Sequence, residues 1–158
     1  MAVSPGPPWP RTPMIGLIQR VREAAVDVGG ERVGAIGSGL LVLVGVRRDD
    51  DERNAARLVE RILGYRMFAD DRGRMNLNLT QTGGGLLLVP QFTLAADTRS
   101  GRRPGFDPAA PPARAEALFD HLVRTARDSH PAVATGRFGA HMQVRLTNDG
   151  PITVLFEV

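Results

Sequence analysis

Apolar residues along the chain gather in short runs separated by polar or glycine-rich turns, a pattern typical of a protein dominated by β-strands. The run at 40–46 has no polar side chain, which predicts a central strand buried on both faces. Gly29-Gly30-Glu31 separates two short runs and predicts a hairpin. The expected strands are 14–21, 25–28, 32–36, 40–46, 86–89, 142–147 and 152–158, the last two flanking a turn at 148–151.

Two stretches have the spacing of an amphipathic helix, with apolar residues recurring every three or four positions. The first follows Asp49-Asp50-Asp51, and the second covers 113–127, directly behind Pro111 and Pro112. A carboxylate at the start of a helix caps free backbone N–H groups, so we interpret the acidic triplet as a cap, with metal binding as the alternative. The apolar positions are Ala55, Leu58, Val59, Ile62 and Leu63 in the first helix, and Leu118, Phe119, Leu122, Val123 and Ala126 in the second.

These elements predict an α/β protein in a three-layer arrangement, with mixed β-sheets that are barrel-like and two main helices covering one face. A chain of 158 residues fits one compact domain, which we place at 14–158. Residues 1–13 are rich in proline, lack the apolar stretch of a secretory signal and are expected to form a disordered extension. No apolar run approaches the roughly 18 residues that span a bilayer, so no membrane partner is expected.

The amino-acid composition excludes some kinds of functional site and allows others. The sequence contains no cysteine, which excludes disulfides, thiolate metal sites and a cysteine nucleophile, and which suits a reducing compartment. All 20 cationic residues are arginine, and the net charge is +3. Arginine binds phosphate through a planar fork, so this composition allows RNA binding. The base composition of the genome is an equally open explanation for the missing lysine.

Familiar catalytic motifs are missing from the sequence. No serine lies in a G-x-S-x-G turn, and His121, His130 and His141 lack the spacing of a metal-binding motif. Gly83-Gly84-Gly85 is not followed by the Lys-Ser/Thr of a phosphate-binding loop. By elimination, an enzyme built from this sequence relies on backbone groups and on its substrate, and neither a metal nor a cofactor is indicated.

Two motifs make the interpretation specific. Pro90-Gln91-Phe92-Thr93-Leu94 follows the expected strand at 86–89, and Asn148-Asp149-Gly150-Pro151-Ile152-Thr153 lies near the C-terminus. Together with Ile18-Gln19-Arg20-Val21 and Leu63-Gly64-Tyr65-Arg66, in this order and at this separation, they closely resemble the D-aminoacyl-tRNA deacylase family over 14–158. Taken alone, the Asn-Asp-Gly segment would be interpreted as an ordinary hairpin turn.

The resemblance implies a symmetric homodimer that works in the cytoplasm on the 3′ end of aminoacyl-tRNA, with no DNA partner. Gln91-Phe92-Thr93 is implied to line the pocket of one subunit, and Gly150-Pro151, joined by a cis peptide bond, to reach in from the other. Arg20 is implied to hold this pair in orientation, and Met142 to lie close to the pocket. One departure is Pro90, where the family usually has serine, because proline lacks both a hydroxyl and a backbone N–H.

The implied arrangement has a physical logic. A cis bond before proline costs only about 0.5–1 kcal/mol, and it would turn two carbonyl oxygens toward the α-amino group of the substrate. An L-side chain has to occupy the crowded side of the α-carbon, whereas a D-side chain or the hydrogen of glycine does not, so selection works by rejection. Thousandfold discrimination needs about 4 kcal/mol. Steric overlap typically supplies about 1–3 kcal/mol, so desolvation or lost hydrogen bonds have to contribute.

The expected reaction is hydrolysis of the ester that joins a D-amino acid, and also glycine, to tRNA. An ester needs no strong nucleophile when the oxyanion is stabilised, and the backbone N–H groups of Phe92 and Thr93 are candidate donors. Gln91 is expected to position the terminal adenosine, and the resemblance implies that the ribose 2′-hydroxyl assists. Nothing nearby activates Thr93 as a nucleophile, so we assign it to positioning. The alternatives are a non-catalytic tRNA-binding module with the same fold and a metal-dependent hydrolase.

Overall fold

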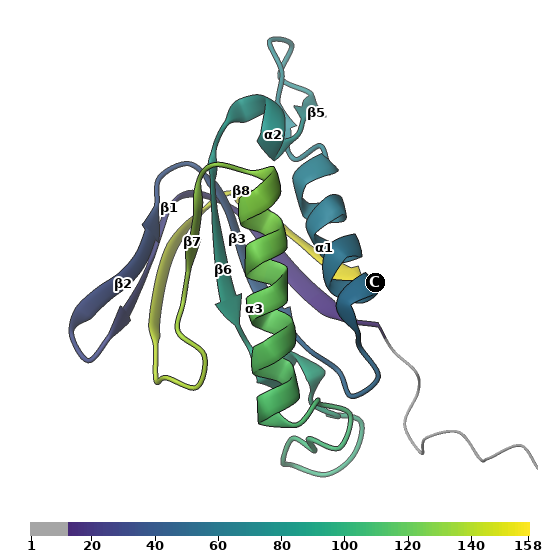
Figure 1. Ribbon diagram of the computed structural model, residues 1–158. Helices are drawn as coiled ribbons and strands as arrows, with labels where there is room; N and C mark the ends of the chain where they lie inside the picture. The colour runs from purple at the N-terminus through teal and green to yellow at the C-terminus, as the bar shows by residue number, and fades with distance from the viewer. Residues whose placement is uncertain (1–12) are drawn as a thin grey trace, which may run out of the picture.

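The computed structural model describes residues 13–158, so the expected extension lies, apart from its last residue, outside the described residues. Most strands form one large curved sheet with two long helices packed beside it (Figure 1), and two short strands pair separately. In chain order the elements are β1 (Ile15–Val28), β2 (Glu31–Ile36), β3 (Gly39–Gly45), α1 (Glu52–Gly64), β4 (Phe68–Ala69), β5 (Met75–Leu77), α2 (Leu79–Thr82), β6 (Gly85–Pro90), the 3-10 turn η1 (Phe92–Ala95), α3 (Pro112–Ser129), β7 (Val133–Thr135) and β8 (Gln143–Glu157).

Strand β1 is the hub of the large sheet. Its first half pairs with β3, its second half pairs with β2, and β8 runs along both halves, all antiparallel. The pairs β3–β6 and β6–β7 are parallel, which makes the sheet mixed, as the sequence predicts. The sheet curls until β2 approaches β7: a Cβ added at Gly34 would lie 2.3 Å from the carbonyl oxygen of Thr135. This near closure gives the expected barrel-like shape, in which glycine alone fits at position 34.

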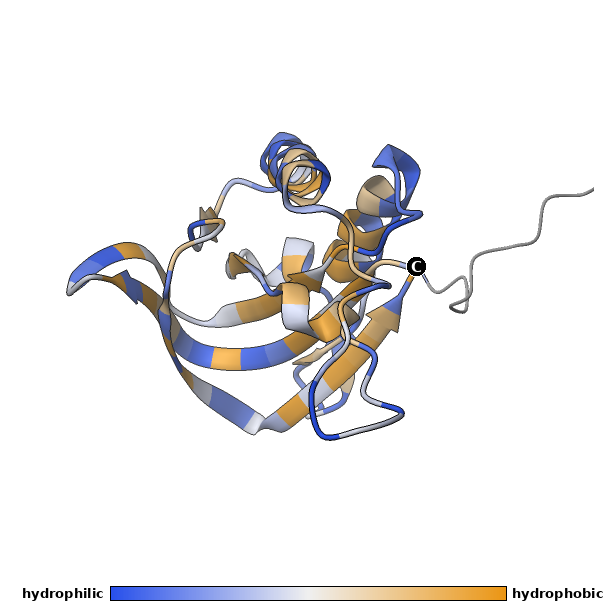
Figure 2. Cartoon of the chain, turned by 90° about the horizontal axis from the view of Figure 1, so that it is seen from below, coloured by the Kyte–Doolittle hydropathy of each residue, from blue (hydrophilic) through white to orange (hydrophobic). Residues whose placement is uncertain are grey.

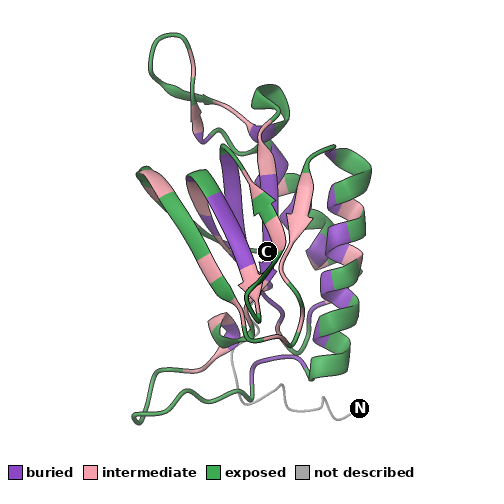
Figure 3. Ribbon diagram, turned by 90° about the vertical axis from the view of Figure 1, so that its left-hand side faces the viewer, coloured by how far each residue is buried: buried purple, intermediate pink, exposed green. Residues whose placement is uncertain are grey.

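Both long helices cover the same face of the sheet, as predicted (Figure 2). The main core lies between them and the strands, and Figure 3 shows the buried side of α3 turned toward the sheet. Each apolar helix position expected from the sequence is buried. The opposite face of the sheet carries a smaller apolar cluster of Val21, Ala24, Val26, Leu41, Leu87 and Val89.

The acidic triplet begins α1 in the way that the cap interpretation predicts. The side chain of Asp51 accepts hydrogen bonds from the backbone N–H groups of Arg53 and Asn54, and the side-chain oxygen of Asn54 accepts one from the N–H of Asp51. Asp50 is buried and accepts a 2.6 Å hydrogen bond from the N–H of Arg47. Burial raises the pKa of Asp50 to about 6, although this bond and the charge of Arg47 oppose the shift.

Two expectations about strand boundaries are wrong. The runs at 14–21 and 25–28 belong to one strand, β1, whose pairing register with β8 shifts between Gln19 and Val21 and again between Val21 and Glu23. The C-terminal segment is likewise one strand, β8, and not a hairpin around 148–151. Both halves of β8 run antiparallel to the same strand, β1, so the chain does not reverse direction there. The Asn-Asp-Gly-Pro segment is therefore an irregularity within a strand, which displaces its backbone from the ladder.

Candidate active site

A cavity of about 450 Å³ opens where β6 ends. Its walls come from three parts of the chain: residues 89–92, the start of α3 with the residues just before it, and the segment 138–144. Pro90, Gln91, Phe92 and Met142, which the sequence analysis selected, all line this cavity. Thr93 follows on the same turn but is not part of the lining.

The turn η1 is held in place by backbone bonds. The N–H of Gln91 donates to the carbonyl oxygen of Val44 at 2.8 Å, which extends the parallel pairing of β6 with β3. The first hydrogen bond of the turn runs from the N–H of Leu94 to the carbonyl oxygen of Gln91 at 3.2 Å. The N–H groups of Phe92 and Thr93 precede it and therefore make no hydrogen bond within the turn. Gly45 lies beneath, where a Cβ would meet the Cβ of Leu94 at 2.9 Å. The absence of a side chain at Gly45 lets the turn pack against β3.

The side chains of the turn make two contacts. The amide nitrogen of Gln91 donates a short hydrogen bond to the hydroxyl of Thr93, which ties these two side chains together. The ring of Phe92 is 58% exposed and lies 5.2 Å, centroid to centroid, from the ring of Phe106 in the following loop. The turn thus presents a polar pair and an aromatic surface next to each other.

Pro90 causes no loss of sheet pairing at its position. On the β3 side the ladder bond is made by the N–H of Gln91, and on the other side β7 has already ended at Thr135. On that side the chain continues past β7, where the N–H of Gly136 donates to the carbonyl oxygen of Leu88 at 2.9 Å, and the ring of Pro90 packs against Gly136. Met142 packs nearby: a Cβ at Gly136 would lie 2.8 Å from the sulfur of Met142 and 3.6 Å from Cδ of Pro90.

Part of the cavity wall was not predicted from the sequence. Phe138 and His141 line it, from the segment that connects β7 to β8. His141 was set aside because it belongs to no metal or catalytic spacing. Its position directly before Met142 was the available signal, since the resemblance already placed Met142 near the pocket. The other two histidines lie elsewhere: His121 is on α3, and His130 is buried at the end of α3 with Nε2 2.7 Å from the carbonyl oxygen of Gly84.

The corner in β8, which we define as residues 148–151, is not part of the cavity of its own chain. Gly150 and Pro151 are exposed, and the peptide bond between them is cis. The guanidinium of Arg20 donates from Nε to the carbonyl oxygen of Asp149 at 2.9 Å and from Nη1 to the carbonyl oxygen of Met67 at 2.7 Å. The structure therefore brings Arg20 to the corner, and it brings Pro90, Gln91, Phe92 and Met142 to the cavity, as two separate groups.

Asn148 braces the same corner from within. Its side-chain oxygen accepts from the N–H of Ile152 at 2.8 Å, and its side-chain nitrogen donates to the hydroxyl of Thr153 at 2.8 Å. Gly150 has a φ of +137°, and a Cβ there would lie 2.8 Å from Cγ1 of Ile152 and 3.2 Å from Nη2 of Arg20. The corner is an exposed backbone feature with a fixed shape, and glycine is the residue that its geometry accommodates.

Two negative findings apply to the part of the chain that the structure describes. Within residues 13–158, no group of three or more His, Asp or Glu side chains is placed to hold a metal ion. The helices within the same range are too short or too polar to cross a membrane.

Comparison with known proteins shows which family the chain is similar to. Residues 17–157 match the family model described as D-Tyr-tRNA(Tyr) deacylase. A D-aminoacyl-tRNA deacylase of Thioalkalivibrio sulfidiphilus is 67% identical over 145 residues, which cover 92% of this chain and 97% of the relative. A D-aminoacyl-tRNA deacylase of Stutzerimonas stutzeri is 65% identical over 144 residues, which cover 91% of this chain and 99% of the relative.

Solved structures agree on the fold. The c-Myc DNA Unwinding Element Binding Protein superimposes with a TM-score of 0.88 at 35% identity, covering 91% of this chain and 98% of that chain. A probable eukaryotic D-amino acid tRNA deacylase superimposes with a TM-score of 0.78 at 18% identity, covering 92% and 99% of the two chains, a likeness of fold alone. Fold and site thus define a small mixed α/β protein whose cavity is built around a backbone turn. The chain belongs to the D-Tyr-tRNA(Tyr) deacylase family, a family of enzymes.

Proposed function

We propose that this protein hydrolyses the ester of D-aminoacyl-tRNA to free amino acid and tRNA in the cytoplasm, and that it accepts glycyl-tRNA as well. Membership of the family supports the reaction class. The observation that carries the proposal is the cavity of about 450 Å³ that opens beside the Gln91–Phe92 turn, whose lining contains no serine, threonine, cysteine, lysine or carboxylate side chain. The lack of cysteine in the sequence fits a reducing compartment.

The chemistry rests on backbone donors. The ester carbonyl lies against η1, where the N–H groups of Phe92 and Thr93 donate to the oxyanion that forms when water attacks. One such donor contributes about 2.7–4 kcal/mol to the transition state. The substrate's own 2′-hydroxyl, next to the ester, orients the attacking water and passes its proton on to the leaving 3′-oxygen, so no side chain has to act as a base.

The side chains of the turn position the nucleoside. The amide nitrogen of Gln91 already donates to the hydroxyl of Thr93, which leaves the side-chain oxygen of Gln91 to accept from the amino group of the terminal adenosine. The Thr93 hydroxyl is outside the cavity lining and is engaged by Gln91, which supports a positioning role over a nucleophilic one. Pro90 and Met142 shape the adjoining wall.

Chiral selection requires a second copy of the chain. The corner at 148–151 exposes Gly150 and Pro151, is braced by Arg20 and Asn148, and lies outside the cavity of its own chain. In a symmetric dimer, Gly150 and Pro151 of one subunit enter the cavity of the other and crowd the side of the α-carbon where an L-side chain would project. Selection then works by rejection, so glycine passes with the D-amino acids.

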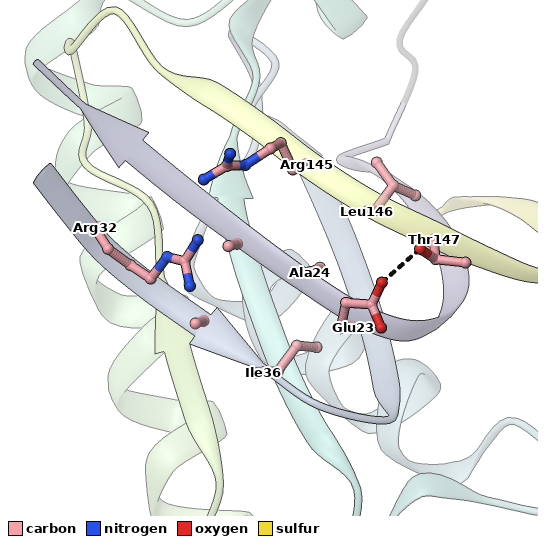
Figure 4. A pocket seen from close by; sticks show the side chains of 9 residues that line it. Glu23, Ala24, Arg32, Ile36, Arg145, Leu146 and Thr147 are labelled. Carbon is pink, nitrogen blue, oxygen red and sulfur yellow. Dashed lines mark hydrogen bonds between the residues drawn. The ribbon is translucent and has the colours of Figure 1, made fainter. Parts of the chain in front are cut away.

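The surface beside the corner fits such a dimer. Leu155 is 54% exposed and lies opposite Leu17, which lies opposite Leu43, so an apolar row crosses three strands on the face away from the helices. Next to the corner, a hollow of about 290 Å³ lies over β1, β2 and β8. Figure 4 shows Leu146 and Ile36 at this hollow beside the hydrogen bond from Thr147 to Glu23. The exposed side chains of Leu146 and Leu155 support an interaction surface on this side of the sheet.

The reaction is tested by incubating the purified protein with D-tyrosyl-tRNA and following the loss of ester. We expect strong acceleration over buffer, unchanged by a chelator. Tight, salt-sensitive tRNA binding without acceleration would instead establish a non-catalytic tRNA-binding module. Loss of activity with the chelator would establish a metal-dependent hydrolase.

The cross-subunit site is tested by mixing two variants. One carries Gln91→Ala with Phe92→Ala and has a defective cavity; the other carries Gly150→Ala and has a defective corner. In mixed dimers, the intact cavity of the second variant receives the intact corner of the first. We expect mixing to produce a population that hydrolyses D-tyrosyl-tRNA and rejects L-tyrosyl-tRNA. If the corner acts on the cavity of its own chain, the mixture has no such population.

A further inference from the structure

The loop between η1 and α3 carries an aromatic residue and three arginines that have no role in the proposed chemistry. The loop is closed at its base, because Asp97 and Gly105 exchange backbone hydrogen bonds of 2.7 Å and 2.9 Å. Beyond them, Ala110 donates to the carbonyl oxygen of Val46 at 3.1 Å and fixes the loop to β3's end. Residues 98–104 therefore form an exposed tip on an anchored base.

The aromatic residue is Phe106. Its ring is 41% exposed and lies 5.2 Å from the ring of Phe92, with the two planes tilted by 48°. Phe92 lines the cavity, so the pair extends the aromatic surface from the cavity outward onto the loop. Exposing two phenyl rings to water is unfavourable, which indicates a surface that is covered when the protein works.

The arginines of the tip differ in their partners. Arg99 is held by the carboxylate of Asp97, with two hydrogen bonds of 2.9 Å that lower the pKa of this carboxyl to about 2. Arg102 and Arg103 are exposed, and their guanidinium groups have no hydrogen-bond or ion-pair partner among residues 13–158. Two uncompensated cations therefore lie on the same loop as the exposed aromatic pair.

We propose that Phe92, Phe106, Arg102 and Arg103 form a platform for the unpaired nucleotides that precede the terminal adenosine of the tRNA 3′ end. The proposal rests on the function proposed above. Proteins bind single-stranded nucleic acid by stacking bases on aromatic rings while cations contact the phosphates, and this loop supplies both groups beside the cavity. An acidic protein partner would use the two arginines but would leave the aromatic pair at the cavity mouth without a role.

Two substrates distinguish the contribution of the platform from the contribution of the cavity. D-tyrosyl-tRNA contacts both, whereas D-tyrosyl-adenosine, the ester on a single nucleoside, contacts the cavity alone. We expect Arg102→Ala with Arg103→Ala to raise the KM for the tRNA at least tenfold more than the KM for the nucleoside. Phe106→Ala should shift the same ratio in the same direction. The matched control is Arg124→Ala with Arg127→Ala, two exposed arginines on α3, which should leave the ratio unchanged.

Salt dependence supplies a second readout that needs no turnover. Each phosphate contact on a single strand contributes about 0.7 to the slope of log affinity against log salt concentration. The double variant at 102 and 103 should therefore bind uncharged tRNA with a slope shallower by about 1.4. Equal losses on both substrates, or an unchanged slope, would overturn the platform. If the wild-type protein hydrolyses neither substrate but the double variant still binds tRNA with the shallower slope, the proposed reaction is overturned and the platform stands.

Discussion

The guanidinium of Arg20 donates a 2.9 Å hydrogen bond to the carbonyl oxygen of Asp149, across 129 positions of sequence. The same side chain donates to the carbonyl oxygen of Met67, so it links the exposed corner to the segment that follows α1. Only 16% of the Arg20 side chain is exposed, which favours a fixed geometry. The corner is thereby supported by the body of the domain and not by its own strand alone.

Replacing Arg20 tests whether this support serves selection. Arg20→Ala removes both hydrogen bonds, and we expect the free energy of unfolding to fall by about 2 kcal/mol. We also expect the ratio of D-tyrosyl-tRNA to L-tyrosyl-tRNA hydrolysis to fall at least tenfold, because the corner is no longer held. Arg22→Ala is the control: Arg22 is 72% exposed and reaches only the Asp149 carboxylate, at 3.8 Å. A selectivity that survives Arg20→Ala would limit Arg20 to a structural role.

Gly150→Ala tests the corner itself. A Cβ at φ +137° is strained and meets Ile152 and Arg20, so we expect unfolding to become easier by about 1–3 kcal/mol and L-rejection to weaken. Gly29→Ala carries a similar backbone cost at φ +56°, with no atom within 4 Å of the new Cβ, and should leave selectivity intact. Hydrolysis rates on both stereoisomers measure the outcome. Unchanged rate and unchanged L-rejection in Gly150→Ala would exclude the corner from the site.

Gly45→Ala tests the placement of η1. The added methyl group meets the Cβ of Leu94 at 2.9 Å and pushes the turn away from β3, so the N–H groups of Phe92 and Thr93 lose their alignment. We expect kcat to fall at least tenfold with a smaller change in KM. Gly64→Ala, at the end of α1 with no atom within 4 Å of the new Cβ, is the matched control. Normal kcat in Gly45→Ala would show that the position of this turn is unimportant for the reaction.

Phe92→Ala removes an aromatic wall of the cavity without opening the core. The ring is 58% exposed, so we expect the free energy of unfolding to change by less than about 0.5 kcal/mol. Activity should nevertheless fall about tenfold or more in kcat/KM, because pocket shape is lost. Met75→Ala, at a residue that is 53% exposed on β5, should change neither quantity. Denaturation curves and steady-state kinetics on the same preparations distinguish the two effects.

Asp50 makes stability depend on pH. Its pKa is raised to about 6 in the folded protein, so between about pH 4 and 6 the folded state binds a proton that the unfolded state does not. This contribution lowers the free energy of unfolding as pH rises through that window, by up to about 3 kcal/mol. Asp50→Asn removes the titration, so the stability difference between wild type and variant should change between pH 4 and 6 and be flat above pH 7. A difference independent of pH would show that folding does not raise the pKa of Asp50.

The sequence predicted the elements whose residues repeat a clear pattern. The strand at 40–46 was identified from an uninterrupted apolar run, and the stripes of both long helices from the helical spacing of their apolar residues. The continuity of β8 was not predictable, because Asn-Asp-Gly-Pro has the composition of a turn and only its pairing with β1 shows that the chain runs straight on. Short elements such as β7 and η1 were missed, since three or four residues carry no period.

The same reasoning explains which residues of the candidate site could be predicted from the sequence. Gln91, Phe92 and Met142 were named through motif resemblance, and the fold places them on one cavity. Phe138 and His141 were not, because they come from a connection without secondary structure and acquire a role only when β7 brings that segment beside β6. Phe106 was missed for a related reason, since its ring contact with Phe92 is recognisable only in three dimensions.

A single comparison of initial rates on D-tyrosyl-tRNA, L-tyrosyl-tRNA and glycyl-tRNA bears most directly on the proposed site. An obstruction on one side of the α-carbon should let the D-ester and the glycyl ester react and slow the L-ester about a thousandfold or more, a barrier of about 4 kcal/mol. Equal rates for the two tyrosyl stereoisomers would contradict it.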